Sequence, residues 1–227
     1  MPEQPGIEAI ATYARREALA VTVTGAFHPG PEDGVPIDCG TLVLLGPDEP
    51  GFWPHFCTSP EGRDGAPAPI DRWSRRVLRD LAATFGGVAV FTFDGPPWLP
   101  FTAWAQRTGR VWTSPVGMLV HDETGLFFSC RGAVALPQKL ALAAPGVRPC
   151  DTCAAPCLDA CPPRALTGAG YNVPRCHDFL DTAAGADCMT RGCAVRRACP
   201  VGVGRRLAAQ SAYQMTQFHG KAVACDG

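Results

Sequence analysis

Eight cysteines lie within residues 150–199, and their spacing limits what this part of the chain can fold into. The first four fall within twelve residues and end at Pro162, and the last of the next four is followed by Pro200. In order, the eight are Cys150, Cys153, Cys157, Cys161, Cys176, Cys188, Cys193 and Cys199. The surrounding sequence is rich in Gly, Pro and Arg and poor in strand-forming runs. A module of this size and composition cannot rely on an apolar core alone, so metal ligation is expected to supply the missing stabilisation.

The two Cys-Pro endings indicate how the ligands are shared. In bacterial two-cluster ferredoxins, the cysteine that ends each run ligates the cluster of the other run. Cys161-Pro162 and Cys199-Pro200 therefore predict an exchange of ligands between two [4Fe-4S] clusters. The first cluster is expected to be held by Cys150, Cys153, Cys157 and Cys199. The second cluster is expected to be held by Cys161, Cys176, Cys188 and Cys193.

The spacing also departs from the ferredoxin pattern. The first run reads C-x2-C-x3-C-x3-C-P, one residue longer than C-x2-C-x2-C-x3-C-P, and Pro156 precedes its third cysteine. The second set is looser, C-x11-C-x4-C-x5-C-P. Zinc is the alternative, because a pair such as Cys150 and Cys153 suits a tetrahedral structural site. Zinc, however, gives no reason for two Cys-Pro endings, and we interpret His177 as a polar neighbour of the site.

Four cysteines lie outside the pattern, and we interpret them as small buried hydrophobic residues. They are Cys39, Cys57, Cys130 and Cys225. Twelve cysteines in a reducing compartment indicate metal ligands rather than disulfides. The N-terminal sequence lacks the pattern of a signal peptide, and no apolar run approaches the length of a membrane span. We therefore expect a cytoplasmic protein without a membrane partner.

Charge is distributed unevenly along a chain whose formal net charge is only −1. Residues 1–130 carry 15 acids and 9 bases, whereas residues 131–227 carry 11 bases and 6 acids. The small net charge gives no indication of a nucleic-acid partner. The basic excess lies among the cysteines, where it would compensate anionic clusters; a solvated basic face is the alternative.

Hydrophobic patterns in the first part of the chain predict helices and strands in mixed order. Helices are expected at 7–19, from an N-cap at Asp71 onward, and at 100–108, with strands at 19–27, 41–46 and 86–93. We expect residues 47–70 to form a long loop and residues 116–130 to form a hairpin about the turn 122–125. These elements fit an α/β or α+β sandwich with one mixed sheet. A boundary near residue 145 would separate an α/β domain (1–145) from a ferredoxin-like domain (146–227), so the whole protein is expected to be α+β. After the cysteines we expect an amphipathic helix that packs back on the second domain through Tyr213 and Phe218.

The cysteine module resembles the dicluster ferredoxin module of epoxyqueuosine reductase and its relatives among the reductive dehalogenases. The resemblance lies in the order of a run ending in Cys-Pro, then Arg175-Cys176, then Gly192-Cys193, then a second Cys-Pro. It implies a first domain related to flavin nitroreductase and cobalamin-processing folds. It also implies a cobalamin between the two domains that receives electrons from the nearer cluster.

The segment from Phe93 is weakly similar to the same family, and it places Asp94 where the family has a proton-donating aspartate. Asp94 would lie at the carboxyl end of a strand, where open α/β sheets place ligands; the alternative is an Asp-Gly turn residue. The family's Gly-Lys-Asn segment is replaced by "TSPVGM", and no helical-repeat tail follows the cysteines, so a tRNA substrate is not expected.

Three functions remain open from the sequence. The first is a redox enzyme, a reductase whose clusters pass single electrons to cobalamin, or to a flavin, or to a substrate. The second is an electron-transfer protein with no catalysis of its own. The third is a zinc-stabilised binding module. For the first two, the expected partner is an electron donor such as a flavodoxin, a ferredoxin or a reductase.

Overall fold

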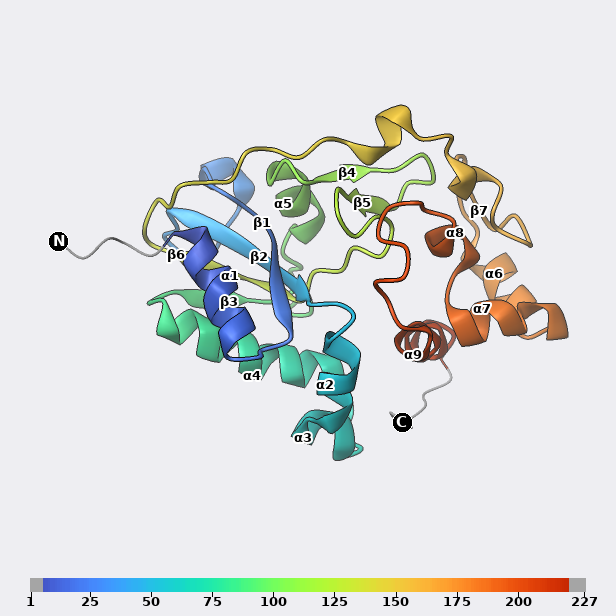
Figure 1. The fold of residues 1–227 in the computed structure, drawn as a ribbon, viewed down its shortest axis with the longest axis horizontal. Helices are drawn as coiled ribbons and strands as arrows, with labels where there is room; N and C mark the ends of the chain where they lie inside the picture. Colours follow the sequence, from blue (N-terminus) through green and yellow to red (C-terminus); the bar gives the residue numbers. More distant parts are fainter. Residues whose placement is uncertain (1–5, 221–227) are drawn as a thin grey trace. The chain divides into compact units, whose positions relative to one another are not determined.

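A computed structural model describes residues 6–220 of the chain as two compact units (Figure 1). The first unit comprises residues up to Arg110 together with Ser129–Gly146, and the second comprises Val111–Phe128 together with the residues from Val147 onward. Each unit combines helices with small antiparallel sheets, so the α+β class is confirmed. The second unit therefore includes a segment, residues 111–128, that lies before the boundary expected near residue 145.

The first unit is built on a four-stranded sheet in the order β1-β2-β6-β3. Its elements are α1 (Ile7–Arg16), β1 (Val21–Phe27), η1 (Pro31–Asp33), β2 (Thr41–Pro47), α2 (Phe52–Thr58), α3 (Pro60–Arg63), α4 (Pro69–Thr84), β3 (Val88–Val90), α5 (Phe101–Arg107) and β6 (Gly132–Leu136). The expected helices near 7–19, 71–85 and 100–108 and the three expected strands are confirmed.

The expected mixed sheet is wrong, because every neighbouring pair of strands is antiparallel. The chain passes from β2 through α4 to β3, a connection that often joins adjacent parallel strands. Here β6 lies between β2 and β3 and runs opposite to both, with Thr41 opposite Leu136 and Val88 opposite Ala135. The strand inserted from later in the chain thus converts a potential parallel pair into an antiparallel sheet.

Helix α4 covers the sheet at β3 and β6, and α1 lies against β1 (Figure 1). The four-residue spacing of Trp73, Val77, Leu81 and Phe85 predicts one buried stripe on this helix. The first three are buried, and Phe85 is half-buried at the C-cap. Asp71 is not the N-cap, because the helix begins at Pro69 after Ala68 in a left-handed conformation. Asp71 instead pairs with Arg131, whose guanidinium also donates to Ser74 Oγ at 3.0 Å.

The expected loop at 47–70 is also wrong, because α2 and α3 form there. Pro54 is compatible with α2 because it lies in the first turn, where a missing N–H breaks no helical hydrogen bond. Phe52, Trp53 and Phe56 are buried, and the Phe52 ring lies edge-on to Trp73 with centroids 5.1 Å apart. The aromatic cluster of this segment therefore belongs to the core of the first unit.

The second unit is built from short elements around the cysteines. Its elements are β4 (Val111–Thr113), β5 (Leu119–His121), η2 (Pro149–Thr152), η3 (Pro156–Leu158), β7 (Leu166–Thr167), β8 (Gly170–Tyr171), α6 (Val173–Leu180), η4 (Ala183–Gly185), α7 (Ala186–Arg191), α8 (Ala194–Arg197) and α9 (Ala208–Phe218).

The hairpin predicted at 116–130 is paired differently from the expectation. β5 pairs with β4, and only an isolated bridge between His121 and Gly125 spans the expected turn. Residues 126–131 form no strand, and the chain then enters β6 of the other sheet.

The helix expected after the cysteines is α9 (Ala208–Phe218). Tyr213 is buried in it, Phe218 is 39% exposed, and Cys225 lies outside the described residues.

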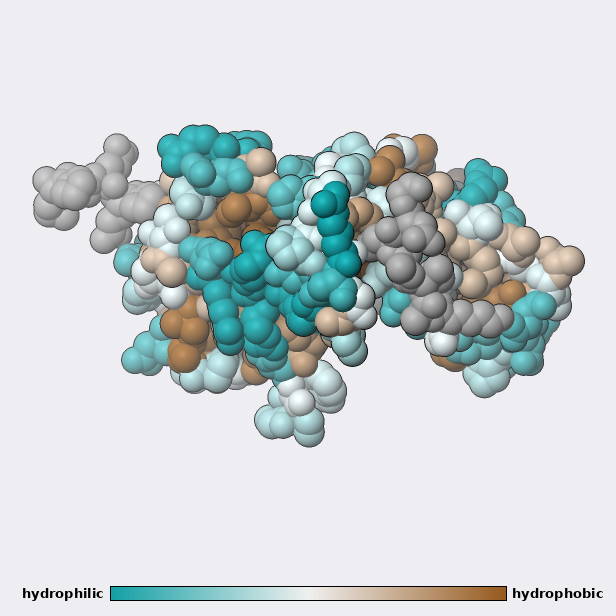
Figure 2. All heavy atoms as spheres, turned by 90° about the horizontal axis from the view of Figure 1, so that it is seen from below, coloured by the Kyte–Doolittle hydropathy of each residue, from teal (hydrophilic) through white to brown (hydrophobic). Residues whose placement is uncertain are grey.

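Of the helices that the structure describes, none combines the length and the apolar character that a membrane crossing requires. Figure 2 shows hydrophilic side chains over much of the viewed face, with small apolar patches between them.

Candidate metal centres

Four of the cysteines line one hollow in the second unit. Cys150 lies in η2, Cys153 directly after it, Cys157 in η3, and Cys199 in the loop after α8. We call these four residues group 1. Apart from the cysteines, the wall of the hollow is largely apolar: Ser114, Pro115, Val120, Leu126, Pro149, Ala155, Pro156, Pro200 and Val201. The structure thus brings together the four residues expected to hold the first cluster.

The thiols of group 1 influence one another electrostatically. Burial is the main cause that raises the pKa of Cys157, and the neighbouring sulfurs of Cys150, Cys199 and Cys153 raise it further. Burial likewise raises the pKa of Cys150, with Cys199 and Cys153 among its neighbours. Four thiolates without a cation would therefore be unfavourable here. A bound cation would stabilise the thiolate forms, and binding would release protons.

The extra residue of the first run now has a structural role. Ala155 adopts a left-handed conformation with φ of 52° and caps η3, which places Pro156 and Cys157 in the next turn. The Ala155 N–H points to the Cys153 sulfur at an N···S distance of 3.4 Å. The extra residue before Cys157 thus allows a turn at Ala155, and the amide of Ala155 donates to the sulfur of Cys153.

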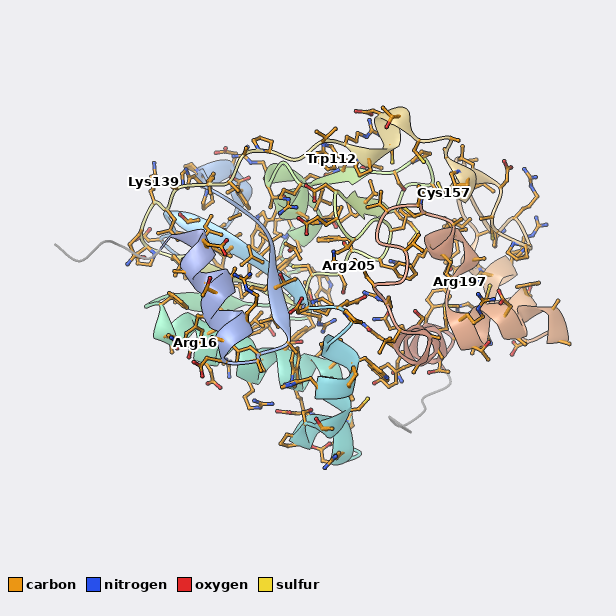
Figure 3. The ribbon with its side chains drawn as sticks, viewed as in Figure 1. Arg16, Trp112, Lys139, Cys157, Arg197 and Arg205 are labelled. Atoms are coloured by element: carbon orange, nitrogen blue, oxygen red, sulfur yellow. The ribbon has the colours of Figure 1, made fainter. Side chains whose placement is uncertain are left out.

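Helix α8 and the 111–128 segment hold the two ends of group 1. η3, which carries Cys157 (Figure 3), packs against α8. Cys199 follows that helix in the chain. The Arg196 guanidinium donates to the Leu126 carbonyl at 2.5 Å, and Arg206 donates to the Phe127 carbonyl at 2.9 Å. Arg196 and Arg206 thus connect the residues around and after α8 to the 111–128 segment, in addition to supplying positive charge.

Gly125 is a part of this centre that the sequence analysis missed. A Cβ at this position would lie 2.3 Å from the Val201 carbonyl oxygen and 2.9 Å from the Cys199 sulfur, and the glycine has φ of +58°. At Gly202, a Cβ would lie 2.6 Å from the Thr124 carbonyl oxygen. The turn at 122–125 and the loop after Cys199 therefore meet backbone to backbone. The Asp-Glu-Thr-Gly sequence indicated a turn but not its partner.

The remaining four cysteines form group 2. Cys161 follows η3, Cys176 lies in α6, Cys188 is buried in α7, and Cys193 caps α8. The pKa of Cys176 is raised mainly by burial and then by the sulfurs of Cys193, Cys161 and Cys188. All four members therefore lie near one another, as the exchange of Cys-Pro ligands predicts.

Several hydrogen-bond donors point to the sulfurs of group 2. The N–H groups of Ala165 and Leu166 donate to Cys161 at 3.2 and 3.4 Å. The Ala194 N–H and the Tyr171 hydroxyl oppose the rise in the pKa of Cys188 and of Cys176, respectively. Donors of this kind stabilise negative charge on a thiolate and influence the reduction potential of a cluster bound to it.

Within residues 6–220, no three His, Cys, Asp or Glu side chains lie close enough together to hold a single metal ion. A [4Fe-4S] cluster has a different requirement, because its four cysteines bind four separate iron atoms. Each group offers four thiols as donors, and group 1 surrounds a hollow with a largely apolar wall. The chemistry of both groups therefore fits a four-iron cluster.

Other residues singled out from the sequence lie apart from these groups. Asp94, in the first unit, is exposed and forms a two-pronged ion pair with Arg75 of α4. Cys39 and Cys57 are half-buried, and burial raises the pKa of Cys130 to about 11. His177 packs edge-on against Phe218, with ring centroids 4.7 Å apart.

Comparison with known proteins adds no relative. No protein-family model matches the chain, and no curated protein or solved structure matches it either.

Proposed function

We propose that this chain is an iron–sulfur redox protein that holds one [4Fe-4S] cluster on group 1 and a second on group 2. It would accept electrons one at a time and pass them on. A single observation carries the proposal: the eight cysteines divide into the two sets that the exchange of Cys-Pro ligands requires.

The position of Cys199 makes this division specific. Cys199 is only six residues from Cys193, yet its sulfur neighbours Cys150 and Cys157, more than forty residues earlier in the chain. Ligands taken simply in sequence order would divide the cysteines into 150–161 and 176–199. The crossed arrangement is typical of two-cluster ferredoxins.

When bound, the clusters supply one-electron redox chemistry. The residues around the cysteines would determine the environment of each cluster. Val120 and Leu126 exclude water from one side of group 1, while amide donors serve the sulfurs of Cys153 and Cys161. A reductase that uses cobalamin or a flavin rests on the resemblance alone. It would require the reconstituted protein to retain a corrinoid or flavin.

The test of the proposal begins with protein purified without oxygen. We expect a brown protein with about eight iron and eight acid-labile sulfide atoms per chain, whose visible absorption bleaches with dithionite. A colourless, zinc-loaded protein would overturn the proposal in favour of a zinc-stabilised module.

The division into groups is tested with cysteine-to-serine variants. Cys199→Ser and Cys193→Ser should each lose about four of the eight irons, because each removes one ligand from a different cluster. Combining Cys199→Ser with Cys157→Ser should cost no further iron, whereas combining it with Cys193→Ser should remove nearly all. Cys57→Ser, in the first unit, is the matched control and should keep the full content. If Cys199→Ser and Cys157→Ser together lose both clusters, the division is wrong.

A further inference from the structure

Tyr171 stands out among the residues around group 2. It is the last residue of β8, where it pairs with Leu166 of β7. It interacts electrostatically with the sulfurs of Cys176, Cys193 and Cys161, and the interaction with Cys176 is the strongest of the three. Tyr171, Cys176 and Cys193 also line a common hollow. One phenol therefore lies beside two cysteines of the group and interacts with a third.

The backbone fixes Tyr171 relative to group 2. Leu166, its strand partner, donates its N–H to Cys161, so the β7–β8 pair is attached to one ligand of the group. The next residue, Asn172, donates its N–H to the Ala165 carbonyl at 2.7 Å. Its side chain also accepts from the Arg175 N–H at 3.0 Å and so caps α6, which carries Cys176.

The ring of Tyr171 is held from its other side. Phe218 of α9 stacks on it with centroids 6.2 Å apart and an interplanar angle of 16°. The tyrosine keeps 46% of its surface exposed. The ring thus has a defined position although it lies at the surface.

We propose that Tyr171 is a positioning residue that raises the reduction potential of the cluster on group 2 by donating a hydrogen bond from its hydroxyl to the Cys176 sulfur. This inference rests on the proposed function. Reduction adds one electron, taken from the donor, and so increases the negative charge on the cluster and its sulfurs. A donated hydrogen bond stabilises the more negative, reduced form more than the oxidised form. The reduced cluster is therefore favoured while the hydroxyl is present.

The main test is Tyr171→Phe, which keeps the ring and its stacking on Phe218 but removes the hydroxyl. Potentials are measured by redox titration followed by electron paramagnetic resonance, on anaerobic protein with its iron and sulfide counted. We expect one of two midpoint potentials to become more negative. At a fixed ambient potential, the ratio of reduced to oxidised cluster should fall about tenfold, equal to about 59 mV for one electron.

A second measurement should shift the same midpoint potential in the opposite direction. The chain has 3 tyrosines, so 3-fluorotyrosine can replace all of them during expression. The fluorinated phenol is a stronger hydrogen-bond donor, and the same midpoint should become less negative. The shift should vanish in the Tyr171→Phe background. Tyr13→Phe, in the first unit, is the matched control and should leave both midpoints unchanged.

The possible outcomes distinguish a failure of the role proposed for Tyr171 from a failure of the proposed iron–sulfur function. Absence of iron and sulfide from the unaltered protein would overturn the proposed function. Two clusters with unchanged midpoints in Tyr171→Phe would overturn only the role of Tyr171. Loss of about four irons from Tyr171→Phe would also overturn that role and assign the residue to holding the cluster in place.

Discussion

At the scale of single residues, Gly125 shows how a position without a side chain can determine the backbone around the cysteines of group 1. Its backbone touches the loop that carries Cys199, and a Cβ would meet both the Val201 carbonyl and the Cys199 sulfur. Gly117 lies in the same segment with φ of +77°, but a Cβ there would meet nothing within 4 Å. The two glycines share a left-handed backbone and differ in what surrounds them.

Gly125→Ala is therefore expected to remove the cluster on group 1 and to leave that on group 2. Both Gly125→Ala and Gly117→Ala incur about 1–2 kcal/mol for a left-handed alanine. Only Gly125→Ala also displaces the Cys199 loop. Iron analysis should give about four irons per chain for Gly125→Ala and about eight for Gly117→Ala. Equal iron contents for the two variants would contradict the role assigned to the close contact at Gly125.

The sequence indicates which cysteines belong to each proposed group, but it does not indicate the residues that support them. Cysteine chemistry restricts the ligands to few candidates, and the prolines after Cys161 and Cys199 indicate which ligands cross. The support from Gly125 depends on a contact with Val201, 76 residues later in the chain. A turn motif carries no information about such a distant neighbour.

At the scale of elements, short helices in the second unit place single ligands. α6 has only 8 residues and carries Cys176, and its N-terminus is capped by the Asn172 side chain. An isolated helix of this length is not stable in water, so the cap must contribute to its stability, together with the cluster that we propose on group 2. Under that proposal, the capping residue is coupled to the affinity of group 2 for its cluster.

Asn172→Ala should destabilise α6 by about 1 kcal/mol and accelerate iron loss from group 2 about fivefold. The measurement is the anaerobic time course of iron release to a chelator, in which the phase assigned to group 1 should not change. Asn172→Ser restores a capping oxygen and should release iron at nearly the rate of the unaltered protein. A comparable acceleration in Asn172→Ser would argue against capping as the cause.

Elements with a regular hydrophobic spacing were predicted well from the sequence. Strands whose pairing depends on residues far away in the chain were not. The stripe of Trp73, Val77 and Leu81 predicted α4 because four-residue spacing places these side chains on one face. β6 was missed as a central strand, since its short Ala-rich sequence becomes buried only between β2 and β3. The β5 partner was wrong for the same reason, because pairing with β4 depends on geometry beyond the turn.

At the scale of the whole molecule, the two units differ in what stabilises them. The first has a large apolar core that includes Trp73, Trp104, Phe52 and Phe56. The core of the second is a small cluster of buried residues: Val116, Val120, Leu126, Cys157, Leu166 and Val195. Cys150, Cys161, Cys193 and Cys199 pack against that cluster, so the cysteines of the proposed metal sites form part of the core itself.

Removing the iron should therefore unfold the second unit while the first stays folded. Without metal, the second unit retains few apolar contacts to offset the entropy of its many short elements. Hydrogen exchange of the iron-free protein should show amides of α6, α7 and α8 exchanging nearly as fast as in an unfolded chain. Amides of β2 and β6 should keep their protection.

The control is protein carried through the same treatment and then reconstituted with iron and sulfide, in which protection of α6, α7 and α8 should return. Unchanged protection of these helices in the iron-free protein would mean that the small apolar cluster suffices. Loss of protection in β2 and β6 as well would mean that the two units unfold as one. The expected result, a folded first unit beside an unfolded second, requires that the metal act as the core of the second unit alone.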